Sequence, residues 1–390
     1  MKTITFFAAL FLLLISGAIS AQQESVHRKS AFQVTLFPPV GTNGTEGGNT
    51  VNQLSVNIFA GYAAGLNGVE FGGFLNINRD FMEGVQFSGF ANITGGPVHG
   101  AQFASFANFN GTDSEVAQFA GFANFNNGLT DGFQGAGFAN FTRGYSNAFQ
   151  GAGFGNFSHN LKGAQLAGFG NFASGRVEGA QIAGFGNFAE DVEGAQISGF
   201  VNVAKHVNGV QLGVINVADS VSNGVPIGFL SIVKNGFYEF EIGGSEGLNG
   251  YASFKIGVNQ FYNIFSGGMQ LAADKFRWGY GYGIGTHLMY SEDFKINLEA
   301  VTYQIMEERW SDEYNGLQQL KLTFDKSLSE NFGIFAGPGF NLLVSYDSNN
   351  DGVNPVSHFP PYHMSNWQKG RSTLKAWIGF NAGIRIRKLI

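Results

Sequence analysis

Hydrophobic and polar residues alternate in short segments through the middle of the chain, and these segments repeat. Between Val51 and Asn235 one phrase recurs: Gly, a small apolar residue, Gln, an apolar residue, two small residues, Phe, a small residue, Asn and an apolar residue. It reads GAQFASFANF at Gly100–Phe109 and GAQIAGFGNF at Gly179–Phe188. A fixed period of this kind indicates a repeat architecture.

The most regular members of the repeat are polar. The asparagine returns every 14–16 residues, at Asn76, Asn92, Asn108, Asn124, Asn140, Asn156, Asn171, Asn187, Asn202 and Asn216. A glutamine lies six residues before most of them, with Glu70 in its place in the first copy. We take five of these pairs as the structural signature of the repeat: Gln102 and Asn108, Gln118 and Asn124, Gln134 and Asn140, Gln165 and Asn171, Gln181 and Asn187.

The repeats are predicted to be strands. They are rich in Phe, Val and Ile, and Gly falls in nearly every candidate helical turn, where it costs about 1 kcal/mol relative to Ala. Simple alternation would place Ala101, Phe103 and Phe109 on one face of a strand, and Gln102 and Phe106 on the other.

Two all-β architectures fit a 16-residue unit. In a β-solenoid each unit is one coil, Asn108 lies on Asn92 and Asn124, the amides form ladders, and columns of Phe fill the interior. In an antiparallel meander each unit is a strand, and the repeats could close one large barrel with the later strands. Odd and even copies look alike, which favours stacked, equivalent coils.

After about Gly236 the alternation becomes cleaner. Between Phe276 and Tyr290 the aromatic and aliphatic residues share one face, whereas Gly, Arg and His share the other. The same split appears at Leu374–Ile386. Transmembrane β-strands have this pattern, with apolar side chains on the outer face of the barrel and Gly or polar residues on the inner face. We predict an antiparallel meander or barrel of about eight strands, in which short connections alternate with long ones.

These patterns divide the chain into four parts. Residues 1–21 carry Lys2, an apolar run and then small residues, which is typical of a secretory signal peptide. Residues 22–50 contain a short strand at Ala31–Val40 and a linker, residues 51–235 form the repeat domain, and residues 236–390 form the barrel-like domain.

Composition narrows the range of functions. The 390 residues include no cysteine, which excludes disulfides, cysteine zinc sites and cysteine nucleophiles. The charged fraction is 13% and the net charge is −6, so nucleic acid is not an expected partner. No constellation of catalytic residues stands out, and we expect a protein that is not an enzyme.

One segment resembles a metal-binding loop. Asp347, Asn349 and Asp351 offer oxygen ligands at alternate positions before a Gly, as in the first half of a calcium loop. The twelfth position is His358 instead of the bidentate Glu. The alternatives are weak calcium binding and an ordinary polar loop, and no other cofactor is expected.

The copy GVQLGVINV at Gly209–Val217 resembles the units of bacterial cell-envelope surface-repeat proteins, which read Gly-Val-Gln-x-Gly-Leu-x-Asn. Most other copies have one more residue between Gln and Asn. The resemblance implies an envelope location and no enzymatic activity, while the last part is similar in style to outer-membrane barrels. We therefore expect export by the signal peptide to the bacterial outer membrane or cell surface, with membrane lipid and a surface polymer or protein as partners. The alternative is an outer-membrane transport barrel that uses the repeats as membrane strands.

Overall fold

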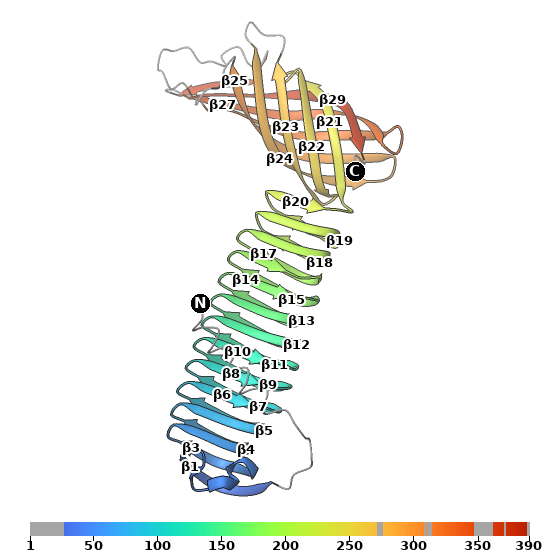
Figure 1. Cartoon of the computed structure of the whole chain (residues 1–390). Coiled ribbons are helices and arrows are strands. Elements are labelled where there is room, and N and C mark those ends of the chain that lie inside the picture. Colours follow the sequence, from blue (N-terminus) through green and yellow to red (C-terminus); the bar gives the residue numbers. More distant parts are fainter. Residues whose placement is uncertain are drawn as a thin grey trace, which may run out of the picture. The chain divides into compact units, whose positions relative to one another are not determined.

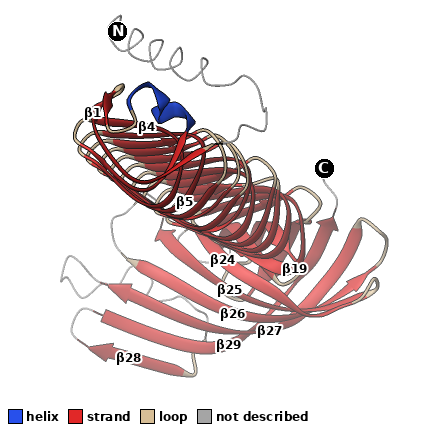
Figure 2. Ribbon diagram, turned by 90° about the horizontal axis from the view of Figure 1, so that it is seen from below, coloured by secondary structure: helices blue, strands red, loops and turns tan. Residues whose placement is uncertain are grey.

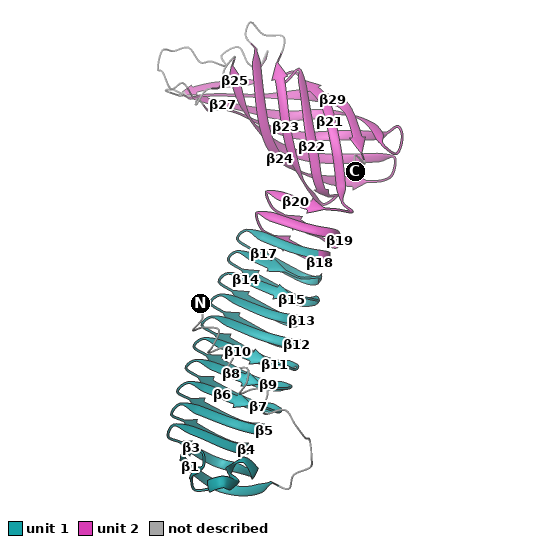
Figure 3. Cartoon of the chain, in the orientation of Figure 1, with its two compact units in different colours: residues 1–204 teal, residues 205–390 magenta. Residues whose placement is uncertain are grey.

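The computed structural model describes residues 27–270, 276–307, 310, 314–346, 362–369 and 372–387. The signal-peptide prediction lies outside these residues. The chain divides into two compact units after Ala204 (Figure 3). The change of fold comes later, near residue 236, so the second unit contains the last solenoid coils as well as the barrel. No helix among the described residues is long and apolar enough to cross a membrane.

The repeats form a β-solenoid of about 11 turns, as the equivalence of the copies predicts (Figure 1). Its strands are β3 Thr50–Asn57, β4 Ala60–Gly72, β5 Leu75–Ser88, β6 Ala91–Thr94, β7 Val98–Ala104, β8 Ala107–Asn110, β9 Ser114–Ala120, β10 Ala123–Asn126, β11 Thr130–Ala136, β12 Ala139–Ala152, β13 Gly155–Ala167, β14 Gly170–Ala173, β15 Arg176–Ala183, β16 Gly186–Phe188, β17 Asp191–Ser198, β18 Val201–Leu212, β19 Ile215–Ile227 and β20 Leu230–Val233.

Successive coils pair in parallel and in register. Gln102 of β7 lies beside Gln118 of β9, and Asn108 of β8 lies beside Asn124 of β10. Parallel neighbours one period apart are incompatible with an antiparallel meander, in which neighbouring strands reverse direction. The alternative of one large antiparallel barrel that includes the repeats is therefore wrong.

Each coil bends where the phrase has two small residues followed by Phe. In the copy at Gly100–Phe109 the bend falls at Ser105 and Phe106, between β7 and β8. Gly100, at the start of the phrase, has φ +129°, a conformation that residues with a side chain rarely adopt. A Cβ added there would also collide with the carbonyl oxygen of Gly84 in the preceding coil.

The bend overturns the prediction that phenylalanines fill the interior. It interrupts the two-residue alternation, so Phe106 is 39% exposed although simple alternation places it on the side of Gln102. Gln102 and Asn108 are fully buried, whereas Phe103 and Phe109 are only partly buried. The interior consists of amides and small or aliphatic side chains, and the aromatic rings lie outside.

The residues before the repeats belong to the solenoid. β1 Arg28–Phe37 pairs in parallel with β3, and β2 Val40–Gly41 folds back on it. The expected linker contains the 3₁₀ helix η1 Gly44–Asn49, which packs against β4 (Figure 2). The strand predicted at Ala31–Val40 thus begins three residues earlier and ends before the two prolines.

The second unit carries a closed antiparallel barrel of eight strands. These are β21 Phe237–Ser245, β22 Gly250–Val258, β23 Phe261–Gln270, β24 Arg277–Tyr290, β25 Phe294–Glu307, β26 Asn315–Ser327, β27 Phe332–Tyr346 and β29 Ser372–Arg387. Each strand pairs with the next, and β29 closes the ring on β21. The short strand β28 Ser365–Lys369 pairs with the first part of β29.

The two faces of the barrel wall match the predicted alternation. Ile284, Phe340 and Phe380 point outward and are 43–59% exposed, whereas Lys295 and Arg385 point inward and are buried. The connections at one end are residues 259–260, 291–293 and 328–331. Those at the other end are residues 246–249, 271–276, 308–314 and 347–371, so three of these four connections are longer than any at the first end, whereas 246–249 is as short as 328–331.

Candidate functional site

A column of glutamines runs through the solenoid interior. Each Nε2 donates to the side-chain oxygen one coil earlier, over 2.5–3.0 Å, and every member is fully buried. The donors are Gln86, Gln102, Gln118, Gln134, Gln150, Gln165, Gln181 and Gln196. Stacked identical amides satisfy one another, which removes the cost of burying them.

The asparagines form a second ladder that runs the opposite way. Each Nδ2, from Asn57 to Asn187, donates to the asparagine one coil later over 2.8–3.0 Å. From Asn76 on, the same nitrogen also donates to a backbone carbonyl of that next coil, as Asn108 does to Phe119 at 3.1 Å. The predicted asparagine ladder is confirmed, and each of these nitrogens also satisfies a strand carbonyl two residues before the bend.

Glu70 ends the glutamine ladder. Its two carboxylate oxygens accept from Asn57 at 2.9 Å, Asn78 at 2.8 Å and Gln86 at 2.8 Å. Every glutamine of the ladder donates towards the coil before it, so the first position needs a group that only accepts. An ionised carboxylate is such a group. The one departure from Gln in the repeat therefore has a structural reason, and Glu70 is 1% exposed.

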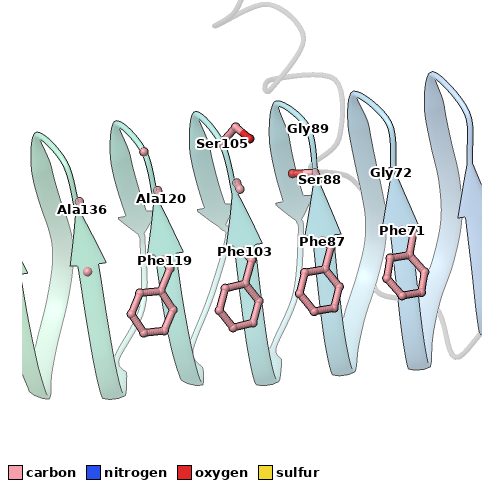
Figure 4. Close-up of a pocket in the computed structure, with 13 residues that line it drawn as sticks. Phe71, Gly72, Phe87, Ser88, Gly89, Phe103, Ser105, Phe119, Ala120 and Ala136 are labelled. Carbon is pink, nitrogen blue, oxygen red and sulfur yellow. The ribbon is translucent and has the colours of Figure 1, made fainter.

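The outer surface of the solenoid carries three columns of aromatic rings, one, four and seven residues after the glutamine. The first includes Phe71, Phe87, Phe103 and Phe119, whose rings lie in a row on successive coils (Figure 4). The second, here called the corner column, comprises Phe74, Phe90, Phe106, Phe122, Phe138, Phe154, Phe169, Phe185 and Phe200. The third contains Phe109, Phe125, Phe141, Phe157, Phe172 and Phe188.

Rings in the corner column follow one another at 4.6–5.4 Å, and eight of its nine members have more than a third of their surface exposed. Contiguous exposed apolar surface on a protein often belongs to an interaction surface. Beside the first column lies a groove of about 560 Å³, whose lining includes Phe87, Phe103, Ala104 and Gly121.

Charged groups of the solenoid gather elsewhere on its surface. The position three residues before the glutamine is polar in nearly every coil, for example Glu83, His99, Glu115 and Glu178. Arg176 pairs with Glu178 at 3.2 Å and with Glu193, and the hydrogen bond to Glu193 raises the pKa of Arg176. The aromatic columns and the charges thus occupy separate strips of the surface.

The barrel interior contains an ion network. Lys255 contacts Glu241 and Glu299 at 2.5 Å each, and Arg385 contacts Glu241 at 2.7 Å and Asp325 at 2.8 Å. All five side chains are at most 1% exposed. They come from β21, β22, β25, β26 and β29, so the network ties five strands together across the interior.

The barrel interior also contains an apolar cluster. It comprises Leu248, Tyr251, Tyr262, Ile264, Val301, Tyr303, Ile305, Leu317, Phe335, Leu343 and Trp377. Gly281 and Gly285 face this cluster, and a Cβ on them would meet the rings of Tyr303 and Tyr262. These two glycines of the sequence GYGYGIG therefore make room for aromatic rings. Glu246 accepts from Trp377 at 2.6 Å.

The predicted metal site lies outside the described residues, because Asp347, Asn349 and Asp351 are not among them. Among the residues that are described, no three His, Asp or Glu side chains are arranged to hold a metal ion. The buried carboxylates of the barrel have Lys and Arg partners instead.

Comparisons with known proteins found no matching family model, no matching curated protein and no matching solved structure.

Reasoning from hydrophobicity missed the aromatic surface. The signal that could have revealed it is the constancy of the polar positions: ten copies keep the Asn, whereas the residue after Gln varies among Phe, Gly, Leu and Ile. The asparagine ladder keeps its residue because each member bonds to its neighbours, whereas the first outer column accepts Gly, Leu and Ile in place of Phe.

Proposed function

We propose that this chain is a non-enzymatic protein of the bacterial outer membrane, in which the barrel is an anchor and the solenoid is a structural or interaction module. The observation that carries the proposal is the barrel wall: its outward face is aliphatic and aromatic, and its interior is occupied by paired charges and rings. An outward apolar band with aromatic residues near both rims is what a membrane barrel requires.

Aromatic residues lie near both ends of the wall. Trp278, Tyr280 and Trp310 contact one another at the long-connection end, with ring centroids 5.7–6.4 Å apart. Tyr290 and Phe294 flank a short connection at the other end. Tyr and Trp favour the boundary between hydrocarbon and headgroups, so two such belts fit an anchor that spans the bilayer.

Transport through the barrel is the alternative, and the packed interior argues against it. An eight-stranded barrel is just wide enough for side chains to fill it. Here Trp377 is fully buried in the middle of β29, and Lys255 and Arg385 are held by carboxylates. A solute would have to displace a compensated ion network, at a cost of several kcal/mol for each charge left unpaired.

Fractionation and conductance test the proposal together. The full chain, expressed with its leader in a Gram-negative host, is expected in the outer-membrane fraction after high-salt and carbonate washing, and silent in planar bilayers. Recovery as a soluble monomer without detergent contradicts the anchor. Reproducible single-channel steps that disappear in a variant with a blocked interior would favour the transport alternative.

A further inference from the structure

The last solenoid coil is seated against the outer wall of the barrel, within the second unit. β20 pairs with β19 on one side only, and its other edge faces β22 and β23. The Ser231 N–H donates to Asn263 Oδ1 at 2.8 Å, and Asn263 Nδ2 donates to the Gly228 carbonyl at 2.8 Å. The barrel wall therefore satisfies an edge whose backbone groups would otherwise be unpaired.

Asn263 is an outward-facing polar residue on a strand with apolar outward neighbours. It is fully buried, because the coil covers it. An amide on the lipid face of a barrel is costly unless its hydrogen bonds are made. Its partners are backbone atoms of the coil and the Tyr282 hydroxyl at 2.8 Å, so the wall is built to receive this coil.

Phe229 joins the two surfaces. It occupies the repeat position of the corner column, one residue after Gly228. Its ring stacks on Tyr282 at 4.7 Å and meets Phe265 edge-on at 6.0 Å, and both are outward residues of the wall. Phe229 remains 55% exposed, and Ile284, two residues beyond Tyr282 on the same face, is 43% exposed. Lipid that covers Ile284 must therefore also meet Phe229.

The contact lies near the end of the barrel that has the short connections. Asn263 follows the start of β23 by two residues, just after the connection of residues 259–260. β21 begins and β29 ends at this same end, because Glu239 lies opposite Arg387. In outer-membrane barrels the short turns face the periplasm.

We propose that the last coil of the solenoid, with Ile227 and Phe229 exposed, is embedded in the inner leaflet of the outer membrane beside β23 and β24. The chain that precedes this coil is then on the periplasmic side of the membrane. This inference rests on the proposed function, because it needs the barrel to be in the membrane. The occupant of this surface is phospholipid: the apolar strip is continuous with the lipid-facing wall, and the polar side chains at the contact, Ser231, Asn263 and Tyr282, already have hydrogen-bond partners.

Spin labels on single cysteines test the lipid contact, since the chain has no cysteine of its own. Labels are placed at Phe229→Cys, at Ile284→Cys on the barrel wall, and at Phe154→Cys in the middle of the corner column. In reconstituted bilayers of phosphatidylethanolamine and phosphatidylglycerol, collisions with oxygen and with a water-soluble nickel complex report depth. We expect the labels at 229 and 284 to favour oxygen by several-fold and the label at 154 to favour nickel.

The two proposals fail in different ways. If the label at 284 reports lipid but the label at 229 behaves like the label at 154, the proposal of an embedded coil is wrong. The proposal that the barrel is a membrane anchor then still stands. A label at 284 that favours nickel overturns the anchor itself.

The side of the membrane is tested on cells with an impermeant maleimide. We expect Phe154→Cys to react only after the outer membrane is permeabilised, whereas Met364→Cys, near the long connections, reacts on intact cells. Met364 is 72% exposed, so its thiol is open to the reagent. Reaction of Phe154→Cys on intact cells overturns the periplasmic placement.

Discussion

The solenoid and the barrel both bury polar side chains and expose aromatic or aliphatic ones, but they satisfy the buried polar groups in different ways. In the solenoid each buried amide bonds to the same residue one coil away, as Gln118 does to Gln102. In the barrel Arg385 forms ion pairs with Glu241 and Asp325, which come from two other strands and do not belong to a repeat. A ladder of neutral amides can be built by repeating one residue type in every coil. A buried charge instead needs several oppositely charged residues at specific positions on different strands.

The difference determines how damage spreads. A missing amide leaves its two ladder neighbours short of a partner, but each is neutral and the loss stays within a few coils. A missing charge leaves the opposite charges buried in a closed space, where desolvation is far more costly. The following substitutions test this contrast, beginning with the largest expected effect.

Arg385→Met is expected to lower barrel stability by about 3–5 kcal/mol, because Glu241 and Asp325 lose their shared partner while still buried. The change is measured by denaturant unfolding in detergent, or by the temperature at which the folded band disappears in electrophoresis. Lys326→Met removes the same charge from an exposed position of β26 and should cost little. Equal midpoints for the two variants would refute the buried network.

Gln118→Leu is expected to cost roughly 2–4 kcal/mol. It leaves the Oε1 of Gln102 without that donor and the side-chain nitrogen of Gln134 without an acceptor, while Asn126 keeps only Thr130, all in a buried place. Phe119→Leu, at the next residue on the outer surface, is the matched control and should cost about 1 kcal/mol or less. Hydrogen exchange of the flanking coils measures the stability of both variants. A larger loss of protection in Phe119→Leu than in Gln118→Leu would contradict an interior of amides with aromatic rings outside.

Much of this contrast could be predicted from the sequence. The spacing of Asn108 and Asn124 gives the coil length and the register, and the alternation around Ile284 gives the faces of the barrel wall. The direction of Phe106 could not be predicted from alternation, because the bend at Ser105 resets it. The partners of Arg385 depend on the stagger between strands, which alternation alone does not determine.

Glu70→Gln is expected to lower the stability of the solenoid by about 1–2 kcal/mol. The Glu70 carboxylate accepts three hydrogen bonds, whereas the amide of Gln would place an NH₂ donor against the donors that make them. The loss should appear as faster hydrogen exchange in the first coils, with the later coils unchanged. Glu83→Gln, one coil later on the outer surface, serves as the control. Uniform exchange across all coils in Glu70→Gln would argue against a ladder terminus.

Arg176→Met is expected to leave the unfolding midpoint of the solenoid unchanged. Its pairs with Glu178 and Glu193 are exposed to water, and such pairs contribute little to stability. The comparison with Arg385→Met isolates the effect of burial on the stability contributed by an ion pair, since both variants remove an arginine from carboxylate partners. A midpoint shift similar to that of Arg385→Met would show that the contrast drawn between the two regions is mistaken.

The central claim, a solenoid with amides inside and aromatic rings outside, is tested most directly by thiol reactivity at two adjacent residues. Phe106 is 39% exposed and Ala107 is fully buried, and a single cysteine at either position is the only thiol in the chain. We predict that Phe106→Cys reacts with an impermeant maleimide in the folded, detergent-solubilised protein, whereas Ala107→Cys reacts only after denaturation. Rapid reaction of Ala107→Cys beside a protected Phe106→Cys would contradict the account.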